Sequence, residues 1–509
     1  MATHSGAPET VREGASGKAR GLRRRSPNVA QAVLLGSAAS QLCLALLTTI
    51  YLARVLSPSA FGFFSLVGTV FILSRKFLDL GLGNVAARDI AREPQRERPI
   101  LEGLMAYRRA AGVLLAAGLS IFAVLQNTGA ERFILLGVAL MMLCNGPAAL
   151  DPVFQVRQAQ LGPAILNLAG GLLVLAGSVV FTHAGVAGEA FGWWLVLREA
   201  LLLFFTWLLA QHLLGYRPHP GFRGRALKAF VRPAIVFGLA SLIYTVYFHG
   251  DVFFVYALRG KEELGAYAAA FRPVNPLLFL PWLLMLPLIP VLSVTAVRDR
   301  STFVRQVRGA CAVALGIGAC GMVAGVQVAP DLVRLLYKGH YLVGPLSCVQ
   351  AFRWLAVALA EVCVTTVLTG SLLAIGKEKL LLWIGMTALL VNATANLVLL
   401  RTMNFTAAAI TTAATEALYL ALALIAFRAV AGCAALGWRQ LAYLAPALAM
   451  SLLLPLARRG AVIHVAAGIV LGAICVVILL ATPRARRLRR DLSESSSRLI
   501  MLGDEMAEV

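Results

Sequence analysis

Long apolar runs, separated by short polar segments, fill the chain from residue 29 to residue 482. A membrane-spanning helix needs about 20 predominantly apolar residues, and these runs reach that length. The pattern therefore predicts an all-α integral membrane protein. About fourteen transmembrane helices are expected, at 29–52, 61–82, 110–126, 133–150, 161–183, 186–212, 233–258, 265–294, 309–328, 346–374, 380–400, 405–427, 440–457 and 461–482.

The composition excludes most other classes of protein. Hydrophobic residues make up 59% of the chain and charged residues only 14%, whereas roughly a quarter of the residues in soluble domains are charged. The net charge of +22 could indicate a nucleic-acid partner. The basic residues lie between apolar runs rather than on one soluble face, so we expect contacts with membrane lipids and none with nucleic acid.

The basic residues also predict the orientation. If the N-terminus is cytoplasmic and the runs alternate, 32 Lys and Arg residues fall on the cytoplasmic side and nine on the outer side. A wrong number of runs would have exchanged the two sides partway along and removed this bias. The positive-inside rule therefore places both termini in the cytoplasm, as basic tails at 1–28 and 483–509.

A short sequence repeat divides the runs into two sets of six. Phe61-Gly62-Phe63-Phe64 begins the second run, and Leu264-Gly265-Ala266-Tyr267 begins the eighth, each after a short outer turn. An offset of six runs keeps the same orientation, so the repeat is parallel, as in transporters that bind substrate between two lobes. The expected units are an N-terminal six-helix lobe (29–212), a cytoplasmic linker (213–232), a C-terminal six-helix lobe (233–427) and two appended helices (440–482).

One segment carries a family resemblance. Arg54-Val55-Leu56-Ser57-Pro58 with Phe61-Gly62, followed by Asp79-Leu80-Gly81-Leu82-Gly83 and Ala87-Arg88, resembles the opening of Wzx-type polysaccharide flippases of the MATE-like MOP superfamily. The resemblance implies a V-shaped pair of lobes that exports a polyprenyl-pyrophosphate-linked oligosaccharide across the bacterial inner (plasma) membrane by alternating access. It further implies a role in O-antigen, lipopolysaccharide or exopolysaccharide biosynthesis, with a polysaccharide polymerase and glycosyltransferases as partners.

Five basic residues lie inside the apolar runs, where a charge costs at least about 2.5 kcal/mol and usually faces an interior. The planar guanidinium of arginine binds phosphate oxygens in a bidentate manner. We therefore predict a substrate-binding set that meets the pyrophosphate, with two simpler interpretations left open: a local pair of Arg75 with Asp79 and a structural tie of Asp251 to Arg272. The predicted set is Arg75, Lys76, Arg198, Arg272 and Arg353.

The chain has no phosphate-binding loop of the ATPase type and no fingerprint for a metal or another cofactor. Transport would then depend on an ion gradient or on the substrate gradient, with Asp251, Glu361 and Glu416 as the ion-coupling candidates. A multidrug exporter of the same superfamily is an alternative, although organic cations would favour acidic rather than basic residues. A polysaccharide polymerase, which would be an enzyme, usually needs a long outer loop, and the longest here is only about 329–345.

Overall fold

The structure is a computed structural model that describes residues 27–126, 129–186, 188–215, 238–285, 288–337, 339–458, 460–483, 485, 486 and 490. These residues form helices and connecting turns, without a β-strand among them. The predicted tails (1–28 and 483–509) and the predicted linker (213–232) lie almost entirely outside the described residues.

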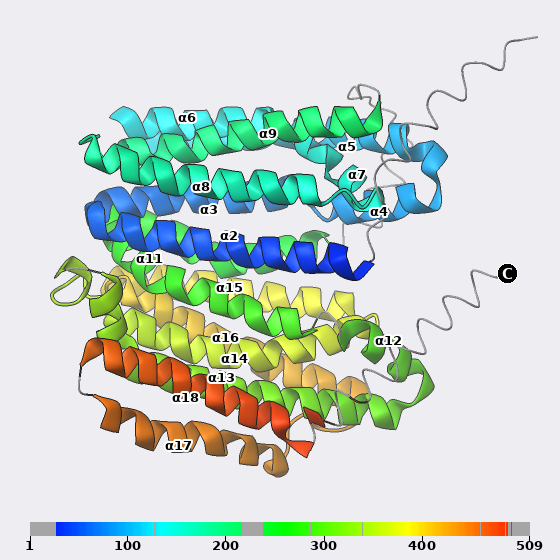
Figure 1. Ribbon diagram of the computed structural model, residues 1–509, viewed down its shortest axis with the longest axis vertical. Coiled ribbons are helices and arrows are strands. Elements are labelled where there is room, and N and C mark those ends of the chain that lie inside the picture. Colours follow the sequence, from blue (N-terminus) through cyan, green and yellow to red (C-terminus); the bar gives the residue numbers. More distant parts are fainter. Residues whose placement is uncertain are drawn as a thin grey trace, which may run out of the picture.

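The helices lie nearly parallel and form two lobes side by side (Figure 1). The N-terminal lobe contains α2 (Pro27–Val55), α3 (Pro58–Asp79), α4 (Leu82–Arg92), α5 (Glu97–Gln126), α6 (Gly129–Leu143), α7 (Asp151–Val156), α8 (Leu161–His183) and α9 (Gly192–Leu214). The C-terminal lobe contains the helical segment 238–249, α11 (Asp251–Met285), α12 (Leu288–Arg298), α13 (Arg300–Leu336), α14 (Val349–Ala374), α15 (Glu378–Thr402) and α16 (Thr406–Ala431). Beside α13, on the side away from the N-terminal lobe, lie α17 (Ala445–Leu453) and α18 (Ala461–Ala481) (Figure 1).

The described helices confirm a polytopic membrane fold. Twelve of them are long and apolar enough to cross a membrane. One of the twelve, Gly238–Leu278, holds two predicted spans, because Gly260 (φ 85°, ψ −178°) interrupts the helical backbone there. The first predicted span lies in α2, of which Ala39–Val55 is a shorter apolar helix. All fourteen predicted runs therefore fall on helical segments.

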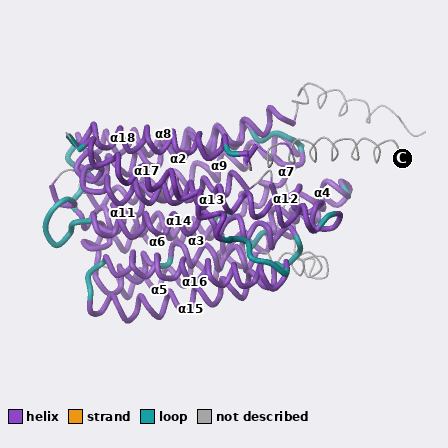
Figure 2. Tube along the Cα trace, turned by 90° about the horizontal axis from the view of Figure 1, so that it is seen from below, coloured by secondary structure: helices purple, strands orange, loops and turns teal. Residues whose placement is uncertain are grey.

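The two ends of the bundle differ in charge. One end carries α4, α7 and α12, together with the start of α2 and the end of α18 (Figures 1 and 2). We name it the basic end, because most described Lys and Arg residues outside the spans lie there, and we name the opposite end the far end.

The segment 83–109, which lies between two of the predicted spans, is helical rather than a loop. This segment forms α4, a 3-10 turn (Pro94–Arg96) and residues 97–109 of α5. In α4 the apolar residues Leu82, Ala86 and Ile90 recur every four residues, so one face of the helix is buried while its arginines face outward.

Local signals explain where α3 begins and ends. Ser57 caps its first turn by accepting a hydrogen bond from the Ala60 N–H at 3.3 Å, and Pro58 occupies the first helical position, where no donor is lost. At the other end Leu80 and Gly81 have positive φ angles of 39° and 72°, and the Asp79 carboxylate accepts the Gly81 N–H at 3.2 Å. The chain therefore turns out of α3 directly after its charged last turn.

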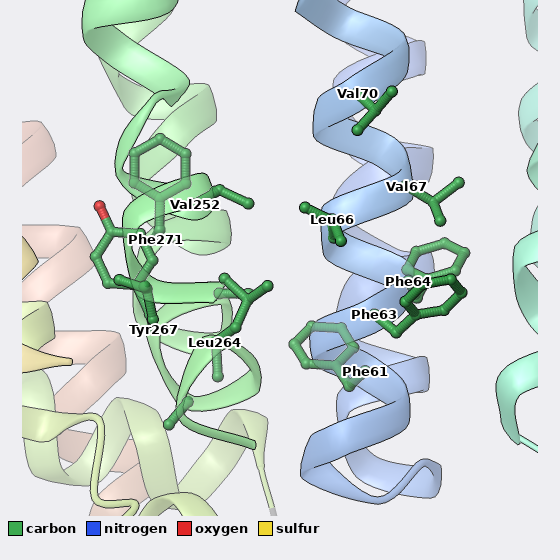
Figure 3. Packing of buried hydrophobic residues seen from close by; sticks show 14 of the residues in the cluster. Phe61, Phe63, Phe64, Leu66, Val67, Val70, Val252, Leu264, Tyr267 and Phe271 are labelled. Atoms are coloured by element: carbon green, nitrogen blue, oxygen red, sulfur yellow. The ribbon is translucent and has the colours of Figure 1, made fainter. Parts of the chain in front are cut away.

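The lobes meet mainly along α3 and α11. Side chains from both helices belong to one buried cluster, which Figure 3 shows from close by, with Phe61, Leu66 and Val70 on α3 and Leu264 and Phe271 on α11. The interface is therefore a packed apolar seam along much of its length.

Two glycines allow the backbones to touch at the far end of this seam. A Cβ atom added at Gly62 would lie 2.0 Å from the Lys261 carbonyl oxygen, and one added at Gly265 would lie 2.1 Å from the Pro58 carbonyl oxygen. Gly62 and Gly265 occupy matching positions of the predicted repeat. The repeated motif thus packs against its own counterpart.

Polar contacts join the same end of the lobes. Arg54 donates to the carbonyl oxygens of Leu335 and Leu336, at 2.6 Å for the latter, and so caps the C-terminus of α13 from the other lobe. Lys261 pairs with Glu131 at 2.7 Å. Together with the glycine contact these interactions define a far-end seal.

Candidate functional site

The predicted basic set begins on α3 with Arg75, which faces α9. Its guanidinium donates through Nε (3.1 Å) and Nη2 to the two carboxylate oxygens of Glu199. The Arg75 side chain is 43% exposed and that of Glu199 only 3%. The contact occupies one edge of the guanidinium, so Nη1 and one Nη2 hydrogen remain available to an anion.

The interpretation that Arg75 forms a local ion pair with Asp79 is wrong. Asp79 instead accepts a hydrogen bond from Arg108 at 2.9 Å, and Arg108 also donates to Asn145 at 3.3 Å. Arg75 and Asp79 are separated because each finds a partner on a neighbouring helix, which a single-helix argument cannot reveal.

Lys76 and Arg272 both reach across the seam between the lobes. The Lys76 ammonium lies 3.2 Å from the Ser241 hydroxyl on the segment 238–249. Arg272, from α11, donates to the Ser65 carbonyl oxygen of α3 at 3.3 Å and lies against Gly68, where an added Cβ would be 3.2 Å from Nη2. Three of the five predicted residues, Arg75 included, therefore lie on or against α3.

The other two basic residues take different places. Arg198 lies in the N-terminal lobe against Gly170 of α8, where an added Cβ would be 3.3 Å from Nε, and within electrostatic range of Arg75. Arg353, on α14, donates to the Val326 carbonyl oxygen of α13 at 3.2 Å, so its described bond stays inside the C-terminal lobe.

The interpretation that Asp251 forms a structural ion pair with Arg272 is also wrong. Asp251 is fully buried and accepts three hydrogen bonds, from Tyr267 (3.0 Å), Thr412 (2.6 Å) and Asn396 (2.8 Å). The three donors come from α11, α16 and α15. Asp251 is thus held by neutral donors, while Arg272 points to the opposite lobe.

A chain of hydrogen bonds continues from this aspartate into the C-terminal lobe. Asn396 contacts the Asn392 side-chain oxygen at 3.0 Å, and Asn392 donates to the Thr415 hydroxyl at 3.3 Å. Tyr247 donates to the same hydroxyl at 3.2 Å and also shares a hydrogen bond with Glu416. The two asparagines of α15 therefore form hydrogen bonds to α11 and α16.

Glu361, the third acidic candidate, lies within electrostatic range of Glu416. Its Oε2 is buried and has no hydrogen-bond partner among the described residues, and the same holds for the side-chain oxygen of Thr365 one turn further along α14. Buried polar atoms normally have partners. Within the described part of the chain, the C-terminal lobe thus holds an acidic polar interior that no ion pair neutralises.

Several charged residues near the site escaped the sequence argument. Arg108 lies outside the predicted span 110–126, yet it is buried three turns into α5. Asp151, at the start of α7, lies within electrostatic range of both Arg75 and Arg108. A sequence signal for the helical position of Arg108 was available. Charged and apolar residues alternate with a helical period before residue 110, so the helix could have been extended towards residue 97.

Comparison with known proteins adds a family to this geometry. A family model described as "Polysaccharide biosynthesis protein" matches residues 31–295, more than half of the chain. The chain belongs to this family. No curated protein matches it.

Solved structures share the fold of this polysaccharide biosynthesis protein. The lipid II flippase MurJ, in an inward closed conformation, is 13% identical with a TM-score of 0.69, over 89% of this chain and 98% of that chain. An inward-facing multidrug resistance MATE family transporter of the MOP superfamily is 14% identical with a TM-score of 0.58, over 77% and 94% respectively. Family and fold together confirm the predicted resemblance to polysaccharide flippases of the MOP superfamily and the predicted MATE-like architecture. The polysaccharide biosynthesis protein is a multi-pass membrane protein.

Proposed function

We propose that this polysaccharide biosynthesis protein is a flippase. It moves a polyprenyl-pyrophosphate-linked oligosaccharide from the cytoplasmic to the outer leaflet of the bacterial inner membrane by alternating access, for O-antigen or a related surface polysaccharide. The basic end is cytoplasmic in this proposal, as the positive-inside rule requires. The chain acts as a transporter rather than as an enzyme.

The observation that carries the proposal is the position of the basic residues along α3. Lys76 and Arg272 lie where the two lobes meet, and Arg75, beside Lys76 on α3, contacts α9 of its own lobe. A guanidinium at such a seam can hold a phosphate oxygen in a bidentate manner and exchange it for protein partners as the lobes move. Arg198 and Arg353 would support this set from inside the two lobes.

The acidic interior of the C-terminal lobe supports an ion-coupling role. Asp251, Glu361 and Glu416 are connected or adjacent through buried polar side chains rather than paired with described basic groups. An intramembrane carboxylate that is not paired with a base commonly marks an ion or proton path. We propose that these three residues couple lobe movement to an ion gradient.

The same acidic interior would favour a second function, export of organic cations by a multidrug exporter. The two functions place their substrate charges differently. A cation would meet the carboxylates inside the C-terminal lobe, whereas a pyrophosphate would meet the basic residues along α3.

The test compares two arginines of the C-terminal lobe. Arg272 and Arg353 are both half-buried and each has one described hydrogen bond to a backbone carbonyl, at 3.3 and 3.2 Å, but only the acceptor of Arg272 lies in the other lobe. We expect Arg272→Ala to reduce flipping of lipid-linked oligosaccharide in proteoliposomes at least tenfold, about 1.4 kcal/mol, and Arg353→Ala to reduce it less. Arg272→Lys should restore activity only in part, because lysine lacks the planar fork.

Protein yield and thermal stability of each variant control for misfolding. Unchanged oligosaccharide flipping in Arg272→Ala and in Arg75→Ala would refute the phosphate site. Efflux of organic cations that depends on Glu361 or Glu416, with no flipping of the oligosaccharide, would favour the exporter.

A further inference from the structure

The basic end of the two lobes differs in how its charges are paired. In the N-terminal lobe each of four arginines lies within 3.1 Å of a carboxylate, in the pairs Arg88–Asp89, Arg96–Glu93, Arg98–Glu102 and Arg157–Glu97. These arginines are neutralised locally. They offer little net charge to a partner, and at this end of the lobe only Arg92 and Arg109 among the described exposed arginines lie within 4.0 Å of no described carboxylate.

The corresponding end of the C-terminal lobe carries a C-lobe basic strip. We define it as the exposed residues at the ends of α12, α13, α15 and α16, in the connection before α15 and in the 3-10 helix Trp438–Leu444, namely Arg298, Arg305, Lys377, Lys379, Arg428 and Arg439. Within the described parts of the chain, none of the six lies within 4.0 Å of a carboxylate.

Two acidic residues adjoin the strip along the chain. Glu378, between Lys377 and Lys379, forms no ion pair with a described basic residue, and Asp299, beside Arg298, is used elsewhere. Asp299 caps α13, where its carboxylate accepts the N–H groups of Ser301 (2.9 Å) and Thr302 (3.1 Å) as well as both hydroxyl groups. The hydrogen bonds from Thr302 and Ser301 hold the pKa of Asp299 below its usual range, so it stays ionised as a cap. The strip therefore keeps its positive charge.

The strip lies at the ends of helices long and apolar enough to span a membrane, and exposed apolar side chains accompany it. Trp438 is 78% exposed with the Arg439 guanidinium 5.3 Å above its ring, and Val297, beside Arg298, is 89% exposed. Tryptophan next to basic residues is typical of the membrane–water interface. A membrane surface accounts for the exposure of both Trp438 and Val297, whereas a soluble acidic partner would require neither to be exposed.

From this arrangement we infer that the C-lobe basic strip is a docking surface for the anionic phospholipid head groups of the leaflet at the basic end. Basic residues near such a leaflet gain about fivefold in affinity per charge, and the gain disappears within about 10 Å in 0.1 M salt. Anionic lipid would thus gather more along the C-terminal lobe than along the N-terminal lobe. This surface is independent of the substrate site proposed above.

The experiment measures binding of phosphatidylglycerol to the purified full-length protein, by native mass spectrometry, with phosphatidylcholine as the uncharged reference. The test variant is Arg298→Gln with Lys377→Gln and Lys379→Gln. The matched control is Arg88→Gln with Arg96→Gln and Arg98→Gln, which removes the same number of charges from the paired end. We expect the test variant to lose at least about tenfold in affinity for phosphatidylglycerol, and the control less than about threefold.

Three results would overturn the inference. Equal losses of phosphatidylglycerol affinity in both variants would show that only the total charge matters. No loss in either variant would mean that the strip serves only to orient the protein in the membrane. Displacement of phosphatidylglycerol by a much smaller amount of polyprenyl phosphate would make the substrate lipid the occupant. If the test variant is unstable, the salt dependence of phosphatidylglycerol binding to the unaltered protein tests the inference instead. Selectivity for phosphatidylglycerol that survives 1 M salt, where screening acts over about 3 Å, would contradict the inference.

Discussion

Substitution of Gly62 by alanine should open the far-end seal. The added Cβ atom would lie 2.0 Å from the Lys261 carbonyl oxygen and 2.8 Å from the Gly265 nitrogen, and both are backbone atoms. Ordinary contacts of a Cβ atom begin at 3.4 Å, so the two helices must separate by about 1.4 Å at this point. No side-chain rotation can relieve the clash, so the lobes themselves must move apart.

The expected size of the effect follows from this overlap. Overpacking of a tight contact costs about 1–3 kcal/mol. If the cost falls only on conformations in which the far end is closed, the population of far-end-open molecules should rise about 5- to 150-fold. Gly265→Ala should act in the same direction, because its Cβ would lie 2.1 Å from the Pro58 carbonyl oxygen.

Spin labels on exposed far-end residues, Ala184 in the N-terminal lobe and Val343 in the C-terminal lobe, would report the distance between the lobes. Gly118→Ala in α5 is the control, since an added Cβ there meets nothing within 4 Å. The reasoning is refuted if Gly62→Ala and Gly118→Ala give the same distance distribution, with both proteins folded and inserted at normal levels.

Three further outcomes are expected. Asp251→Asn replaces an acceptor oxygen by a donor group among three donors, so it should lower the free energy of unfolding by about 1–3 kcal/mol and abolish the dependence of transport on the ion gradient. An unaltered gradient dependence would remove Asp251 from the coupling site. Glu199→Ala should destabilise the protein by about 1–3 kcal/mol and raise the KM for substrate as Arg75 loses its support, while Glu199→Gln should retain most of the stability in the same thermal unfolding assay. Reporter fusions at Lys377 and Arg401 should lie on opposite sides of the membrane, because α15 separates them, and the same side for both would contradict the span count.

The membrane fold was predictable because the bilayer imposes a length and a charge bias that a single sequence displays directly. Each of the fourteen apolar runs falls on a helical segment. The short glycine motif also predicted a parallel repeat, and Gly62 and Gly265 have equivalent positions at the seam. These signals are local, so they do not depend on how the helices rotate about their axes.

The partners of the charged residues were not predictable in the same way. Arg75 bonds to Glu199, which is 124 residues away, rather than to Asp79 one turn along its own helix. Spacing within one helix says which side chains share a face, but not which neighbouring helix that face meets. Arg108 shows a second difficulty. It is buried and paired with Asp79, but in the sequence its charge interrupts an apolar run and suggests that the helix begins later.

The glycine contact has a consequence for the ancestry of the chain. Gly62 meets the turn before Gly265, and Gly265 meets the turn before Gly62, so the contact is reciprocal, like that between identical subunits about a two-fold axis. A six-helix protein with this one glycine motif would have formed the same contact with a second copy of itself. Duplication and fusion of such a subunit would keep the shared contact and free the two halves to differ elsewhere. The basic helix α3 in one half and the acidic interior in the other are differences of the kind that a strict homodimer could not have evolved.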